Sequence, residues 1–155
     1  YTTLSRVVMP LIRYRSTDIT AFLDEPCTCG LQVARRIAKL RGRSDEIVSC
    51  GMGHLSPAVF EQVLDDLPAI SREWQVGVFR AGNHDTIEFR LELTNGATAD
   101  TVTAAIKARV RDRCPDAWRN HELGLFDFGF RFTAPGDPRA GRKARRLVDE
   151  RMRAW

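Results

Sequence analysis

Hydrophobic and polar positions alternate most clearly in the second half of the chain. Between Ile87 and Leu93, apolar residues alternate with Glu and Arg, and phenylalanine recurs at every second position from Phe126 to Phe132. A period of two predicts strands with one buried and one solvated face. Residues 74–80 are also β-prone, and the polar, glycine-containing segment 81–85 separates them from the strand at 87–93. We therefore predict a hairpin over 74–93 and a last strand over 123–132.

Two segments carry helical periodicity instead. After Ser56 and Pro57, apolar residues recur at three- and four-residue spacings, which predicts a helix that begins with a serine N-cap and runs to about Leu67. A second helix is expected from Thr98 to about Cys114. Residues 46–50 form a short predicted strand, and a flexible glycine-containing loop follows it. The basic amphipathic segment 142–153 is compatible with a further helix.

The predicted order over residues 46–132 is β-α-β-β-α-β. This order indicates an α+β fold of the split βαβ (ferredoxin-like) kind, a small antiparallel sheet with helices on one face. The preceding residues predict a short β segment, built from 18–23 and 35–41 around a loop that holds Cys27 and Cys29. The character of the sequence changes at residues 42–45, which we take as a hinge.

Length and composition limit the class of protein. With 155 residues, 43% hydrophobic and 28% charged, the chain fits a globular protein with one main core and excludes collagen, rod-like and wholly disordered chains. The net charge of +4 is concentrated in residues 139–153, so we expect no nucleic-acid partner. No apolar run is long enough to span a bilayer and no signal peptide is evident. We expect a cytoplasmic protein without membrane contact.

The cysteines and histidines give little sign of a metal site. Cys27 and Cys29 could supply two zinc ligands, but a tetrahedral site needs four and no suitable partners lie nearby in the sequence. We therefore keep this pair only as a weak zinc candidate. Cys50 is interpreted as a small apolar residue, and His54, His84 and His121 as structural.

Three short motifs restrict the class of protein further. They are the segments Tyr-Arg-Ser-Thr-Asp at 14–18, Gly-Arg-Ser-Asp-Glu at 42–46 and Gly-Arg-Lys-Ala-Arg-Arg at 141–146. In order and spacing they resemble the motifs of the adenylate-forming (acyl-CoA synthetase) superfamily. The segment 10–15, the loop around Cys27 and the closing residues 143–149 resemble, more narrowly, the phenylacetate-coenzyme A ligase family.

The resemblance implies the C-terminal part of a longer ligase. Residues 1–41 would be the last strip of a large adenylation domain, 42–45 the hinge, and 46–155 the mobile C-terminal domain. The implied reaction converts a carboxylic acid, aromatic in the phenylacetate case, and ATP into an acyl-AMP, and then into a coenzyme A thioester, with Mg²⁺ accompanying ATP. The implied partner is the missing N-terminal large domain, without which we expect this chain to be inactive; homodimer formation is left open.

The resemblance also implies roles for particular residues. Asp18 corresponds to the carboxylate that binds the ribose hydroxyls of ATP or AMP, and Arg43 to a residue near the ribose and phosphates. Asp45 corresponds to the hinge residue and Lys143 to the catalytic lysine of adenylation. The turn at Gly51, Met52 and Gly53 lies where the family presents backbone to coenzyme A.

Some positions depart from the family pattern. Thr17 replaces a usual glycine, which is tolerable if its φ is negative, and Arg142 replaces the glycine before the lysine. Cys50 replaces a usual arginine and the following loop is one residue longer than expected. Because these last changes touch the thioester half, adenylation is better supported than coenzyme A transfer. The alternatives are an adenylate-forming enzyme with another acceptor, or a free-standing ligand-binding or dimerisation module.

Overall fold

The computed structural model describes residues 8, 12–25, 28–29, 35–94, 96–133 and 145–151. The chain divides into two compact units, Tyr1–Asp45 and Glu46–Trp155, and each is described by itself. In the part of the chain described, no helix is both long and apolar enough to cross a bilayer.

The first unit holds a small antiparallel sheet. Its strands are β1 (Phe22–Leu23) and β2 (Arg36–Ile37), which pair in the register Phe22 to Ile37. The predicted β segment is thus confirmed, although each strand is only two residues long. An isolated antiparallel bridge joins Asp18 to Arg43, just before the short 3-10 helix η1 (Ser44–Glu46).

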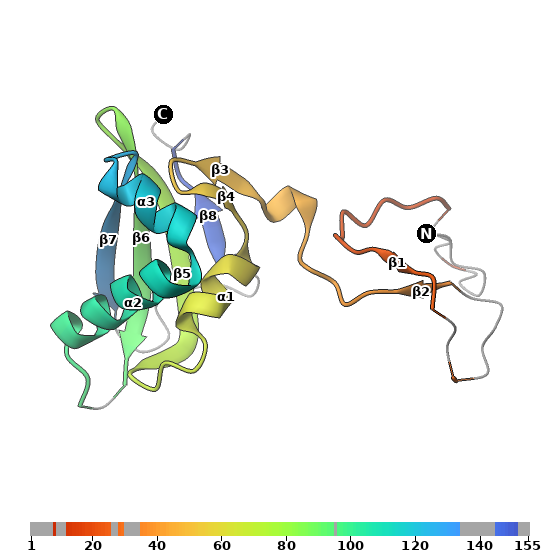
Figure 1. Cartoon of the computed structure of the whole chain (residues 1–155), viewed down its shortest axis with the longest axis horizontal. Helices are drawn as coiled ribbons and strands as arrows, with labels where there is room; N and C mark the ends of the chain where they lie inside the picture. The colour runs from red at the N-terminus through yellow and green to blue at the C-terminus, as the bar shows by residue number, and fades with distance from the viewer. Residues whose placement is uncertain are drawn as a thin grey trace. The chain divides into compact units, whose positions relative to one another are not determined.

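The second unit contains a four-stranded sheet, in the order β7-β6-β5-β8, with three helices covering one face (Figure 1). The predicted α+β class with helices on one face is confirmed. In chain order its elements are β3 (Val48–Cys50), β4 (Gly53–Leu55), α1 (Pro57–Leu64), β5 (Ile70–Ala81), β6 (His84–Leu93), α2 (Ala99–Arg113), α3 (Pro115–Glu122), β7 (Phe126–Thr133) and β8 (Leu147–Asp149).

The strand pairing adds detail that the prediction lacked. The central β5–β6 hairpin is antiparallel as predicted, but β7 runs parallel to β6 and β8 parallel to β5. The first predicted strand, now β3, does not join this sheet; it pairs with β4, which was not predicted. The edge position beside β5 is taken by β8 instead.

The helical interpretation of the C-terminal segment is wrong for residues 147–149. Leu147 is buried against the core, and backbone bonds from Val76 N–H to the Arg146 carbonyl and from Glu150 N–H to the Val78 carbonyl tie this strand to β5. Residues 142–144 and 152–153 of the predicted segment lie outside the described ranges.

Two helices also differ from expectation. Helix α1 ends at Leu64, before the predicted Leu67, because Asp65 is extended and Asp66 has a φ of 59°. Helix α3 was not predicted, since its eight residues carry no apolar periodicity; a proline at its first position was the available signal. Helix α2 agrees with prediction and begins with a capping box at Thr98.

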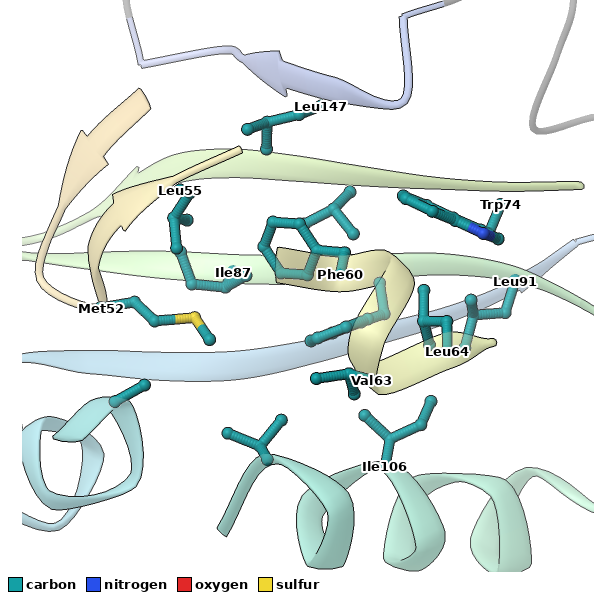
Figure 2. Close-up of a cluster of buried hydrophobic side chains, with 14 of the residues drawn as sticks. Met52, Leu55, Phe60, Val63, Leu64, Trp74, Ile87, Leu91, Ile106 and Leu147 are labelled. Carbon is teal, nitrogen blue, oxygen red and sulfur yellow. The ribbon is translucent and has the colours of Figure 1, made fainter. Parts of the chain in front are cut away.

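The core lies between the three helices and the sheet. Val63 of α1 and Ile106 of α2 point toward the sheet residues Ile87 and Leu91 (Figure 2). The phenylalanine stripe of β7 is a core face, as predicted: Phe126 is buried, and the ring of Phe130 stacks on Phe89 with centroids 5.3 Å apart.

Candidate functional site

Two of the motifs meet in the first unit, at the bridge between Asp18 and Arg43. Backbone bonds of 2.8 Å flank the bridge, from Ile19 N–H to the Gly42 carbonyl and from Ser44 N–H to the Thr17 carbonyl. Asp18 and Arg43 are therefore a non-hydrogen-bonded pair, whose side chains leave the ladder on the same face. The tertiary structure thus brings together residues that are far apart in the sequence.

The predicted hinge residue Asp45 is held by a bidentate ion pair with Arg43. Arg43 Nε donates to Asp45 Oδ1 at 2.9 Å and Nη2 donates to Oδ2 at 2.8 Å. The Thr17 hydroxyl also donates to Oδ1, at 3.0 Å. Hydrogen bonding to the Arg43 guanidinium holds the pKa of Asp45 below its usual range, and the Thr17 hydroxyl adds to this effect. Within this Thr17–Arg43–Asp45 cluster, the Asp45 carboxyl group is therefore ionised at neutral pH.

Thr17 does not have the backbone that its side chain prefers. Its φ is +65°, so the condition under which the replacement of glycine would be tolerable, a negative φ, is not met. A left-handed conformation is unusual for a β-branched residue and costs roughly 1–2 kcal/mol. The glycine usual at this position in the resembling motif would adopt it without strain.

Asp18 presents an exposed carboxylate on the same face. Its backbone is fixed by the bridge, whereas no hydrogen bond joins its side chain to another residue in the described ranges. A carboxylate in this state can accept hydrogen bonds from two neighbouring hydroxyl groups, as a ribose ring presents them.

In the second unit, residues 51–53 form a tight hairpin turn between β3 and β4 rather than the flexible loop that we expected. Met52 is buried in the core, and Gly53, with a φ of +119°, faces open space. Gly51 is packed so closely that a Cβ added there would overlap the Leu125 carbonyl oxygen. The turn is therefore fixed in place, and its open side lies at Gly53.

Asp85, which the sequence analysis did not single out, lies behind this turn. Its Oδ2 accepts the Gly51 N–H at 3.1 Å and the Arg151 Nη1–H at 3.3 Å, and its Oδ1 lies 3.3 Å from Arg80 Nε. The alternation seen from Ile87 to Leu93, continued back by two residues, places position 85 on the buried face. That register was the signal that could have revealed this residue.

Cys50 lies near the charged groups of Asp85 and Arg151. It is half-buried, and burial raises the pKa of its thiol above the usual value, with the Asp85 carboxylate adding to the effect. A thiol of raised pKa is a poor nucleophile at neutral pH, which agrees with its interpretation as a small apolar residue.

Some predicted residues remain without a described position. Lys143 and its neighbours 141–144 lie outside the described residues, as does Cys27 of the weak zinc pair, although Cys29 is described and exposed. Within the described ranges, no three His, Cys, Asp or Glu residues are grouped as a metal site requires. The assignments of Lys143 and of the zinc pair therefore stay predictions.

A cavity of about 670 Å³ lies elsewhere in the second unit and is lined mainly by the residues at and after the C-terminus of helix α1. Trp74 lies in its wall with the guanidinium of Arg146 at 4.4 Å from the ring centroid. None of the predicted site residues that the structure describes lines this cavity, so we do not assign it to the site.

Part of this chain is similar in sequence to known proteins. No family model matches the chain. The phenylacetate-coenzyme A ligase of Thermus thermophilus is 33% identical over 94 residues, which are 61% of this chain and 21% of that protein. The chain thus spans about a fifth of the length of the curated relatives it matches.

Solved structures share the fold. A domain of phenylacetate-coenzyme A ligase from Bacteroides vulgatus has a TM-score of 0.51 and 16% identity, covering 69% of this chain and 94% of that one. A 2-hydroxyisobutyryl-CoA ligase in the postadenylation state, in complex with R3-HIB-AMP, has a TM-score of 0.54 and 23% identity. The match covers 92% of this chain and 29% of that one. At these identities the likeness shows the fold alone.

Proposed function

We propose that this chain, a relative of the phenylacetate-coenzyme A ligases within the adenylate-forming superfamily, is the C-terminal part of an ATP-dependent acid–coenzyme A ligase. The observation that carries the proposal is the 33% identity over 94 residues to phenylacetate-coenzyme A ligase, a protein of which the aligned stretch is about a fifth. The shared fold supports it. The substrate-binding large domain would be supplied by the remainder of the longer protein.

The proposed reaction has two steps. A carboxylate oxygen attacks the α-phosphorus of ATP, the α–β anhydride bond breaks and pyrophosphate leaves with its electron pair. The thiol of coenzyme A, losing its proton, then attacks the acyl carbon of the adenylate and releases AMP. Mg²⁺ would arrive bound to the phosphate oxygens of ATP, as this small cation commonly does.

The geometry of the first unit fits the nucleotide side of this reaction. The exposed Asp18 carboxylate would accept the ribose hydroxyls, and the Arg43 guanidinium, on the same face of the bridge, would lie near the ribose and phosphates. Because Arg43 is hydrogen bonded to Asp45, a change of backbone torsion at Asp45 would carry or break that ion pair. Nucleotide contact and hinge position would thereby be coupled.

The test uses the full-length protein from its native reading frame and measures pyrophosphate release that depends on both acid and ATP. In this enzyme, Lys143→Ala should slow adenylation by about 100-fold, because the lysine charge that offsets the negative charge of the transferring adenylyl group is lost. Thioester formation from a supplied acyl-adenylate should change by no more than a few-fold. Arg145→Ala, which removes a charge two residues away, serves as the control. Equal losses in both half-reactions would contradict the role of Lys143.

The acceptor in the second step is tested separately. The departures at Cys50 and in the following turn favour a second candidate, an enzyme that passes its adenylate to an acceptor other than coenzyme A. AMP release that rises on addition of coenzyme A would support the ligase and exclude this alternative. A native product of only 17.5 kDa would instead favour a free-standing module.

A further inference from the structure

Asp85 is the one buried charged side chain among the described residues, with 5% of its surface exposed. It lies on the core-facing side of β6, in register with Ile87 and Phe89. A carboxylate at such a position costs free energy unless it is paired and hydrogen bonded. The proposed chemistry gives Asp85 no part, so its partners must explain its place there.

Two of its partners are arginines, Arg80 of β5 and Arg151, which lies just after β8. Arg80 lies opposite Asp85 in the β5–β6 register, with Nε 3.3 Å from Oδ1. Arg151 donates to Oδ2 and is itself clamped by Asp149 of β8, through bonds of 2.9 Å from Nε and 2.7 Å from Nη2. The position of the Asp85 carboxylate is therefore set by Arg80 of β5 and by Arg151, which follows β8.

The third partner is the Gly51 N–H group, 3.1 Å from Oδ2. On the other side of this residue the Gly51 carbonyl accepts a bond from Asn120 Nδ2 of α3, at 3.2 Å. The missing side chain lets Gly51 lie directly against the Leu125 carbonyl. The Gly51 N–H and carbonyl groups are thus bound by side chains of β6 and α3, respectively. The open side of the turn lies at Gly53.

We propose that Asp85 is a positioning residue that fixes the turn Gly51–Gly53, and that capture of coenzyme A in the thioester step depends on it. The inference rests on the proposed function, because it takes coenzyme A as the molecule that meets the turn. Loss of the carboxylate would free the Gly51 N–H and leave Arg80 and Arg151 without their shared anion. The turn would shift while the nucleotide contacts at Asp18 and Arg43, in the other unit, stayed as they are.

Glu88 supplies a matched control. It lies on the same strand, three residues after Asp85, and also binds two arginines: Arg90 Nε at 2.9 Å and Arg131 Nη2 at 3.3 Å. Its side chain points to the opposite face of the sheet, away from the turn. Glu88→Gln therefore disturbs an equivalent ion-pair group without touching Gly51.

The kinetic test is made in the full-length enzyme. Asp85→Asn should raise the KM for coenzyme A by about tenfold, while the KM for ATP and the rate of acid-dependent pyrophosphate release stay within twofold. Glu88→Gln should leave all three values within twofold. If Asp85→Asn raises both KM values equally, or neither, the positioning role is overturned.

A second measurement separates the inference from the proposed function. Hydrogen exchange of the Gly51 amide, measured in this 155-residue chain, should be at least tenfold faster in Asp85→Ala than in Glu88→Gln, with core amides of β6 unchanged. Asp85→Asn, which keeps an acceptor oxygen, should restore part of the protection and serves alone if the alanine variant does not fold. Unchanged Gly51 exchange would overturn the positioning role. A parent enzyme without coenzyme A-dependent turnover would overturn the proposed function and the thioester dependence, even with fast Gly51 exchange in the variant.

Discussion

Thr17 combines a strained backbone with a useful side chain. Its φ of +65° is unfavourable, yet its hydroxyl donates to Asp45 and accepts from Arg43 Nε at 3.2 Å. Thr17→Gly and Thr17→Val both remove the hydroxyl, but only valine keeps the strain of roughly 1–2 kcal/mol. We predict that the Ser44 amide, which donates to the Thr17 carbonyl, is several-fold better protected from hydrogen exchange in Thr17→Gly. Greater protection in the valine variant would show that the positive φ is not strained.

The pKa of Asp45 offers a second test at the scale of single residues. Arg43 favours the ionised form of the Asp45 carboxyl group and lowers its pKa. The whole stabilising contribution of this ion pair to the first unit is therefore present at neutral pH. It is lost only as the pH falls below about 4, through the lowered pKa. Arg43→Ala should raise the pKa of Asp45 toward its ordinary value, as measured by the carboxyl carbon shift in an NMR titration. Arg35→Ala, which removes a different arginine of the same unit, should leave it unmoved.

Among the elements, the end of α1 depends on a side chain from α2. Arg109 Nη1 donates to the carbonyls of Val63 and Asp65 at 3.1 and 2.6 Å, and Nη2 donates to that of Asp66 at 3.0 Å. The last carbonyls of a helix have no partners within it, and a cation there also opposes the negative end of the helix dipole. The Arg109 guanidinium therefore caps the C-terminus of α1, where Arg113 of α2 also donates to the Gln62 carbonyl, and both side chains join the two helices.

We predict that Arg109→Met lowers the free energy of unfolding by about 1–3 kcal/mol, because three carbonyls lose a charged donor. The free energy of unfolding of Arg109→Lys should lie between those of Arg109→Met and the parent, since a single ammonium group cannot reproduce the planar, forked guanidinium. Lys107→Met, on the same helix, is the control and should be close to neutral. Urea unfolding followed by circular dichroism measures all four chains, and equal midpoints would contradict the capping role.

At the scale of the whole molecule, the two units differ in how they can be stable. Every buried apolar side chain among the described residues lies at position 52 or later, whereas Phe22, Ile37 and Leu40 of the first unit are more than half exposed. A two-stranded sheet without a buried face is marginal in water. Most of the hydrophobic stabilisation therefore belongs to the second unit.

This difference predicts that residues 46–155 fold without the first unit. The shortened chain should unfold in urea cooperatively and at the midpoint of the parent, while residues 1–45 alone should show no cooperative transition. Circular dichroism of both fragments and the parent makes the comparison. A clearly lower midpoint for 46–155 would show that the first unit contributes to the stability of the second.

Local patterning was sufficient for β6, β7, α1 and α2, because a period of two or of three to four residues records which side of an element is buried. The motifs at 14–18 and 42–46 likewise marked Asp18, Arg43 and Asp45 without a structure. They did not show that Arg43 pairs with Asp45, or that Thr17 has a positive φ.

The remaining features were decided by contacts between segments distant in the chain. Strand β8 is three residues long, too short for a period, and forms because β5 offers it backbone hydrogen bonds. The parallel direction of β7 depends on the path of the chain through α2 and α3, which no local pattern contains. Asp85 acquires its place only when Arg80, Arg151 and Gly51 converge on it, since a buried carboxylate is stable only with partners that folding brings together.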